Sequence, residues 1–201
     1  MRIGILGGTF DPPHVAHLIL AEEARLQLGL QTVLWVPAGV PWRKADRQVS
    51  PVSDRVEMVR RAISGNDGFE LCAVEAEEKG PSHMVKTLEV VGGQYQESEL
   101  FLVLGSDALV DLPNWRDPAR LIALARLALA SRGEDGEGLL GSVERELPGV
   151  SNRIVWVAMP KIEISSTELR RRVDDGRGVR YFVPDNVRQY IREAGLYRSG
   201  A

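Results

Sequence analysis

Short apolar runs alternate along the chain with longer stretches in which apolar residues recur at helical spacing. The apolar runs predict strands, and the helical spacing predicts helices. We expect strands at residues 2–6, 32–36, 69–74, 100–104, 126–130 and 154–157. We expect helices at residues 17–28, 54–63, 81–91, 118–125, 166–173 and 185–194, with Ser53 as the cap of the second.

Regular alternation of strand and helix predicts an α/β fold, a three-layer Rossmann-like sandwich around a mostly parallel, doubly wound sheet. Most connections are too short to separate domains, so we expect residues 1–201 to form a single domain. The prolines and charges of residues 38–52 predict a mobile loop. The glycine-rich, acidic residues 131–149 predict a surface excursion with about one helical turn. Ligands of such sheets bind beyond the carboxyl ends of the strands.

Composition narrows the function classes. The chain has 201 residues, of which 44% are hydrophobic and 26% charged, as in an ordinary globular protein. The net charge of −3 disfavours a nucleic-acid or anionic-membrane partner. The single cysteine, Cys72, excludes an internal disulfide. Because no apolar run approaches a membrane span and no signal peptide is evident, we expect a cytoplasmic protein.

The segment after the first strand, GGTFDPPHVAH, contains the most informative residues. Gly7 and Gly8 let a ligand approach the backbone, and His14 and His17 lie on one face at the beginning of a helix. Imidazoles at a helix N-terminus can donate to phosphate oxygens. A structural role is the alternative for either histidine alone. Asp11 is the only nearby third ligand, so we predict no metal site.

A second helix start follows the last strand. Ser165 and Glu168 match the S-x-x-E capping box, and Arg170 follows closely. Such hydroxyls often only cap a helix, but with an adjacent arginine they also suit a chain of phosphates. We interpret Arg171 and Arg172 as solvated surface residues.

Two further residues have both a structural and a binding interpretation. Asp107 directly follows an apolar strand, where a carboxylate can accept hydrogen bonds from ribose hydroxyls or can cap the next helix. Trp115 lies in the loop LPNWRDP, where its indole can stack on an aromatic ring of a ligand or pack on the protein.

Several of these motifs resemble one enzyme family. GGTFDPPHVAH is similar to the GGTFDPxHxGH signature of HxGH-motif nucleotidyltransferases, and ISST with Arg170 is similar to their ISSTxxR signature. Between and beyond them, GPSHMVKTLE, GSDAL, LPNW and VPDNVRQYIREAGLYR resemble the bacterial nicotinate-nucleotide adenylyltransferases of NAD biosynthesis. The resemblance spans nearly the whole chain.

This resemblance implies adenylyl transfer from ATP, bound with Mg²⁺ as MgATP, to nicotinate mononucleotide. The catalytic residues that it implies are His14, His17 and Arg170. The ATP-binding residues that it implies are Gly7, Gly8, Thr9, Phe10, Gly105, Asp107, Ser166 and Thr167. The implied pyridine-nucleotide site consists of Met84, Trp115 and Arg116, and Lys44 is a candidate phosphate contact.

The sequence departs from the family pattern at several positions. Ala16 replaces the glycine of the histidine motif, and His83, Met84 and Arg116 replace residues that are usual in the pyridine pocket. Nicotinamide mononucleotide is therefore an alternative acceptor. Phosphopantetheine is a weaker alternative, because it has no ring to stack on Trp115. A non-catalytic nucleotide-binding regulator is an alternative from another class, and the sequence does not indicate the oligomeric state.

Overall fold

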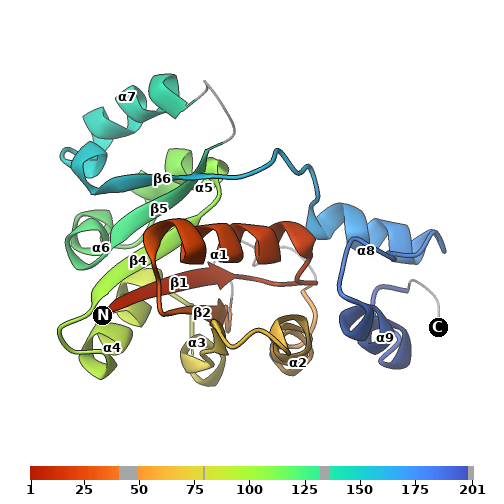
Figure 1. The fold of residues 1–201 in the computed structure, drawn as a ribbon. Coiled ribbons are helices and arrows are strands. Elements are labelled where there is room, and N and C mark those ends of the chain that lie inside the picture. Colours follow the sequence, from red (N-terminus) through yellow and green to blue (C-terminus); the bar gives the residue numbers. More distant parts are fainter. Residues whose placement is uncertain (41–48, 79, 132–135, 199–201) are drawn as a thin grey trace. The chain divides into compact units, whose positions relative to one another are not determined.

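The structure is a computed structural model that describes residues 1–40, 49–78, 80–131 and 136–198. Its strands form one six-stranded sheet in the order β3-β2-β1-β4-β5-β6 (Figure 1). They are β1 (Arg2–Gly8), β2 (Thr32–Pro37), β3 (Phe69–Leu71), β4 (Glu99–Leu104), β5 (Arg126–Ser131) and β6 (Ile154–Ala158). The pairs β1–β4, β4–β5 and β5–β6 are parallel. The strand order reverses direction between β1 and β4, so the predicted doubly wound α/β fold is confirmed.

Helices connect these strands. They are α1 (Val15–Leu28), α2 (Val52–Ile63), α3 (Val74–Glu77), α4 (Met84–Gln94), α5 (Ser106–Asp111), α6 (Pro118–Leu124), α7 (Gly136–Glu146), α8 (Ser166–Asp174) and α9 (Asp185–Glu193). Among the described residues, the connections also include the short 3₁₀ turns η2 (Leu112–Asn114) and η3 (Val150–Arg153). In the part of the chain that the structure describes, none of the helices is long and apolar enough to cross a bilayer.

Contacts group the chain into two compact units. The first unit comprises Met1–Gly7, Leu20–Leu34 and His83–Lys161, and the second comprises Gly8–Ile19, Trp35–Ser82 and Ile162–Ala201. The chain therefore passes from the first unit to the second directly after Gly7, which lies at the end of β1.

The core of the first unit lies around β1, β4 and β5. Side chains from these strands are completely buried, among them Ile3, Leu102 and Leu127. The run LFLVL in β4 is apolar at every position because a parallel strand in the middle of a sheet is covered on both faces. Helix α4 packs against α6, and α5 packs against α7.

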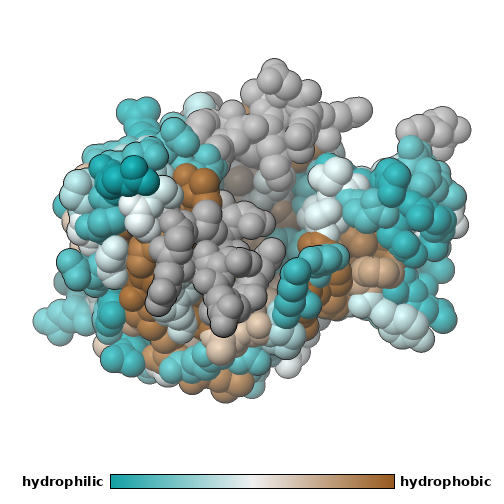
Figure 2. Space-filling model, turned by 90° about the horizontal axis from the view of Figure 1, so that it is seen from above, coloured by the Kyte–Doolittle hydropathy of each residue, from teal (hydrophilic) through white to brown (hydrophobic). Residues whose placement is uncertain are grey.

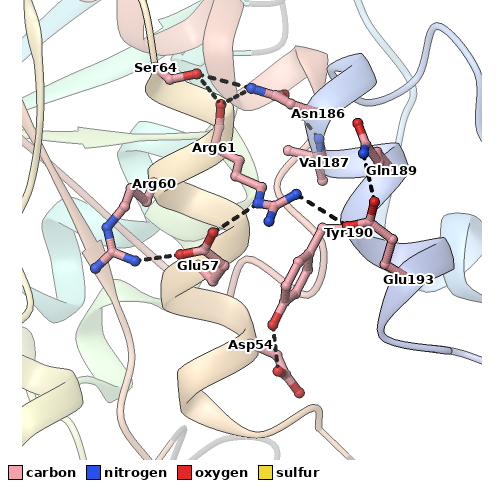
Figure 3. A network of polar contacts seen from close by, with 10 residues as sticks. All are labelled: Asp54, Glu57, Arg60, Arg61, Ser64, Asn186, Val187, Gln189, Tyr190 and Glu193. Carbon is pink, nitrogen blue, oxygen red and sulfur yellow. Dashed lines mark hydrogen bonds and ion pairs between the residues drawn. The ribbon is translucent and has the colours of Figure 1, made fainter.

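In the second unit, α2 packs against α9. Figure 3 shows the polar contacts along this interface. Tyr190 of α9 donates its hydroxyl to Asp54 at 2.8 Å, and Asn186 donates to the backbone oxygen of Arg61 at 2.6 Å. The Arg61 guanidinium lies 4.7 Å from the centre of the Tyr190 ring and 3.7 Å from Glu193. These contacts fix the C-terminal helix on α2.

The outer surface of the C-terminal segment, at the right of Figure 2, is mainly hydrophilic. This agrees with the sequence of α8, in which only Leu169 is buried. Arg171 is exposed and pairs with Glu168 at 2.8 Å, as expected of a solvated residue. Arg172 differs from the prediction, because its guanidinium stacks over the Phe182 ring and donates to the Gly178 oxygen.

Some predicted elements differ from the observed ones. The strand expected at residues 69–74 ends at Leu71, and the short helix α3 follows from Val74. Residues 131–149 contain the eleven-residue helix α7 rather than a single turn, and Val143 of α7 and Leu147 just after it are buried. Ser53 does not cap α2, because that helix begins at Val52, two residues before the expected start, and its N-cap is Pro51.

Candidate active site

The loop after β1 has a constrained backbone in the second unit. We call residues 8–14 the histidine loop. Phe10 has a φ of 50°, in the left-handed region that few non-glycine residues occupy, and its side chain is buried. A Cβ on Gly8 would lie 2.9 Å from the Phe10 ring, so only glycine lets the backbone approach it this closely. The edge of the Phe10 ring meets the ring of His17, with centroids 5.2 Å apart.

The two histidines of this segment lie against each other. The His14 and His17 rings are stacked, with centroids 3.7 Å apart and an interplanar angle of 20°. The backbone N–H of His14 donates to Nδ1 of His17 at 3.3 Å. Neutral His17 therefore carries its proton on Nε2 and can donate a hydrogen bond from that atom. His14 is 5% exposed, and burial lowers its pKa to about 4.

The start of α8 is hydrogen-bonded to the histidine loop. Ser166 donates its hydroxyl to the Pro12 oxygen at 2.9 Å across 154 residues of sequence. Arg170 donates to the Asp11 oxygen at 2.8 Å and to the Thr167 hydroxyl at 3.4 Å. Ser165 accepts from the backbone N–H of Glu168, which confirms it as the N-cap. The structure thus brings together the two separate signatures.

Asp11 anchors the histidine loop on its other side. Its carboxylate accepts a hydrogen bond from Tyr197 at 2.7 Å and from the backbone N–H of Ser50 at 3.2 Å. Burial raises the pKa of Tyr197, and the Asp11 charge raises it further. A cavity of about 440 Å³ is lined by Asp11, Ser50, Arg170 and Tyr197 together with Arg171 and Arg198. Small anions can therefore reach Arg170 through this cavity.

The first unit contains a second group of candidate residues. Gly7 is the last but one residue of β1, and a Cβ there would lie 2.2 Å from the terminal methyl of Met84, which therefore packs directly on the glycine backbone. Met84 is the first residue of α4, where backbone N–H groups have no acceptor within the helix. Gly105 is the N-cap of α5, so the interpretation of Asp107 as a helix cap is wrong. Asp107 lies in the first turn of α5, one residue past its start.

Trp115 directly follows η2. Its side chain is half-buried, and its indole Nε1 is buried without a hydrogen-bond partner among the described residues. The next residue, Arg116, is exposed, and Asp117 caps α6 by accepting from the backbone N–H of Arg120. An aromatic ring that is neither fully buried nor fully exposed retains area for a planar ligand.

The remaining predicted residues are placed as follows. Thr9 lies in the histidine loop between Gly8 and Phe10, and Lys44 lies outside the described residues. No three His, Cys, Asp or Glu side chains gather into a metal site in the described ranges. The Asp11 carboxylate, considered above as a third ligand beside the histidines, is engaged by Tyr197 and Ser50 instead.

Sequence reasoning missed Arg55, which is 1% exposed and holds the backbone around the histidine loop. A signal for it was present. Arg55 occupies the first position of an apolar stripe that continues at Met58, Val59, Ala62 and Ile63, with the spacing of one helix face. A charge within such a stripe indicates a buried polar role.

Comparisons with known proteins agree with these observations. A model of the cytidylyltransferase-like family matches residues 5–172. A probable nicotinate-nucleotide adenylyltransferase from Roseiflexus sp. is 43% identical, over 98% of this chain and 98% of its own. One from Dehalococcoides mccartyi is 38% identical, over 98% of this chain and 97% of its own. The resemblance stated from the sequence motifs is confirmed.

Solved structures share the fold. A Plasmodium falciparum nicotinic acid mononucleotide adenylyltransferase complexed with NaAD aligns with a TM-score of 0.76 and 21% identity, covering 98% of this chain and 97% of that one. The same enzyme complexed with APC aligns with a TM-score of 0.74 and 19% identity, covering 98% and 96% of the two chains.

Proposed function

We propose that this chain, which belongs to the cytidylyltransferase-like family, transfers an adenylyl group from ATP to nicotinate mononucleotide. The products are deamido-NAD and pyrophosphate, and the reaction is a step of NAD biosynthesis. The observation that carries this proposal is the hydrogen-bonded contact between the histidine loop and the start of α8, two segments typical of phosphate binding.

In this reaction a phosphate oxygen of nicotinate mononucleotide attacks the α-phosphorus of ATP. The bond from that phosphorus to the bridging oxygen of the β-phosphate breaks, and pyrophosphate leaves with the electron pair. Because the nucleophile is already an anion, no general base is needed, and catalysis consists of positioning and charge stabilisation. His17 would donate from Nε2 to the α-phosphate as charge accumulates on it, and His14 would support it from the stacked position.

The leaving pyrophosphate would be held at the start of α8. Thr167 and Ser166 supply hydroxyls in the first turn, where backbone N–H groups and the helix dipole favour an anion. Arg170 is fixed by its bond to the Asp11 oxygen, and it lines the cavity that gives a phosphate chain access to it. Gly8, Thr9 and Phe10 would supply backbone to the nucleotide. Gly7 and Gly105, which belong to the first unit, stay candidate nucleotide-binding residues.

The acceptor would be recognised by residues of the first unit. Trp115 would stack on the pyridine ring, and the backbone N–H groups of Met84 and Arg116 would donate to its carboxylate. Asp107 would accept from ribose hydroxyls. Lys44 remains a candidate phosphate contact.

Enzymes of this family that use ATP generally require a divalent metal, and we propose Mg²⁺ bound as MgATP. The donor set fits an ion that arrives with its substrate, because the described residues do not form a carboxylate cluster and Mg²⁺ readily keeps phosphate and water ligands. When bound, Mg²⁺ neutralises charge on the β- and γ-phosphates. We further propose that residues 1–201 act as one nucleotidyltransferase domain; its cytoplasmic location stays a prediction.

The test is pyrophosphate release from MgATP by the purified protein, with nicotinate mononucleotide, nicotinamide mononucleotide or phosphopantetheine as acceptor. We expect release that depends on the first acceptor, with deamido-NAD identified by mass. Nucleotide binding without release for any acceptor would instead support a regulator. Release that is fastest with nicotinamide mononucleotide would support the alternative acceptor.

A further inference from the structure

Arg55 binds three separate backbone segments from the buried face of α2. Its guanidinium donates to the oxygens of Thr9 at 2.9 Å, Ala38 at 2.6 Å and Gly39 at 2.8 Å. Its Nε donates to the Ser50 oxygen at 3.0 Å. The first acceptor belongs to the histidine loop, the next two follow β2, and the last precedes α2. One side chain therefore holds the three loops by their carbonyl groups.

A buried guanidinium is costly, and packing alone does not explain it. Arg55 is 1% exposed, and its four hydrogen bonds to described residues all go to backbone oxygens. Burial lowers its pKa, and the nearby Asp11 charge offsets part of that effect. Its cost is offset by the hydrogen bonds that it gives to backbone oxygens, which would otherwise lack this donor. The planar guanidinium has five N–H donors in fixed directions, so it can hold several carbonyl oxygens in place at once. The flexible lysine side chain lacks this rigid arrangement of donors, and methionine has no donor.

The fixed carbonyl lies next to the strained part of the histidine loop. Thr9 directly precedes Phe10, whose left-handed backbone persists only where surrounding contacts hold it. The Phe10 ring in turn makes a T-shaped contact with the His17 ring, and its centroid lies 5.2 Å from that of Trp35. A shift of the Thr9 carbonyl would therefore move the Phe10 ring and release His17.

We propose that Arg55 is a positioning residue for His17, acting through the Thr9 carbonyl and the Phe10 ring. The expected loss of kcat rests on the proposed adenylyl transfer. The expected displacement of the His17 ring rests on the geometry alone. Arg55 does not contact the reacting atoms in this account; it sets the ring from which the α-phosphate receives its hydrogen bond.

The test compares Arg55→Lys with Arg61→Lys, a matched change on the same helix. Arg61 pairs with Glu57 and reaches Glu193 and the Tyr190 ring of α9 (Figure 3), so its replacement should weaken the α2–α9 contact. Each lysine variant is made with His17 intact and with His17→Ala, and kcat is measured at saturating MgATP and nicotinate mononucleotide. Such a cycle separates action through His17 from an independent effect.

We expect Arg55→Lys to lower kcat at least about tenfold with His17 intact, because small misplacements of a catalytic group are costly. In the His17→Ala background the same change should cost less than about twofold. Arg61→Lys should leave kcat within about twofold. Equal losses from Arg55→Lys in both backgrounds, or an equal loss from Arg61→Lys, would overturn the positioning role.

A second readout needs no activity. The ¹⁵N resonances of the His17 imidazole, assigned with His17→Ala, should shift in Arg55→Lys and stay in place in Arg61→Lys. An unmoved resonance overturns the positioning role even where adenylyl transfer is confirmed. A moved resonance in a protein that releases no pyrophosphate contradicts the proposed function but not the positioning.

Should Arg55→Lys not fold, Phe10→Leu tests the same route, because it removes the ring that transmits the position to His17. We expect its kcat loss also to vanish in the His17→Ala background. An undiminished loss there overturns the proposal.

Discussion

The backbone N–H of His14 donates to Nδ1 of His17 while the two rings stack at 3.7 Å. This pairing decides how the histidines can act. Two imidazolium rings at that distance would repel each other, and the buried His14 stays neutral. His17 is left with a hydrogen-bond donor at Nε2, in a fixed orientation.

Replacing His17 should therefore remove a catalytic donor. His17→Ala should lower kcat by at least ~10²-fold with the fold intact, the scale for losing one preorganised donor to a transition state. His17→Gln should lose less, because its amide nitrogen can occupy the place of Nε2. Initial rates and thermal unfolding of both variants provide the measurement. Near-normal turnover in the alanine variant would refute the role of His17.

Acid should destabilise the protein through His14. Its pKa is about 4 in the folded chain against an ordinary 6.5, so between these values only the unfolded chain takes up the proton. The free energy of unfolding should therefore fall as the pH drops below about 6.5, by about 2 kcal/mol between pH 7.5 and pH 5. Urea unfolding of the wild type and of His14→Gln at both pH values isolates the contribution of His14 to the free energy of unfolding. A pH dependence unchanged in the variant would contradict it.

Arg170→Ala should raise the KM for ATP about tenfold or more, the scale of one lost charge-assisted hydrogen bond. The KM for the acceptor should change little. Arg60→Ala is the matched control, since that exposed side chain pairs with Glu57 on α2 and should leave both constants within about twofold. A larger rise in the KM for the acceptor than in the KM for ATP would show that Arg170 does not bind the triphosphate.

Trp115→Ala should raise the KM for nicotinate mononucleotide and for nicotinamide mononucleotide by a similar factor, about tenfold. Stacking contributes about 1–3 kcal/mol and does not distinguish an acid from an amide. Trp156→Ala, at an exposed tryptophan of β6, is the control and should leave both values unchanged. If the two substitutions gave the same kinetics, Trp115 would not be a pyridine platform.

The alternating pattern predicted the strands well, because a buried parallel strand must be apolar on both faces. It failed where local signals were weak or misleading. In FELCAV the apolar alternation continues past Leu71, yet the chain turns into α3. In residues 131–149 glycine and acidic residues obscured the pattern of helix α7, in which Val143 is buried.

The two family signatures were recognised from their residues, but their contact was not predictable from local sequence. The bonds from Ser166 to Pro12 and from Arg170 to Asp11 join residues more than 150 positions apart. The role of Arg55 was hidden for a related reason. Its acceptors are backbone carbonyls of three loops. Because every residue has a backbone carbonyl, the sequence does not indicate which ones bind Arg55.

The central claim is adenylyl transfer with a preference for the acid form of the pyridine nucleotide. Its most direct test is kcat/KM for nicotinate and nicotinamide mononucleotide, measured as pyrophosphate release at saturating MgATP. Two charge-assisted hydrogen bonds to a carboxylate, at about 1.5–3 kcal/mol each, predict a preference of at least ~10²-fold for the acid. Equal efficiencies, a preference for the amide, or no release with either acceptor would contradict the account.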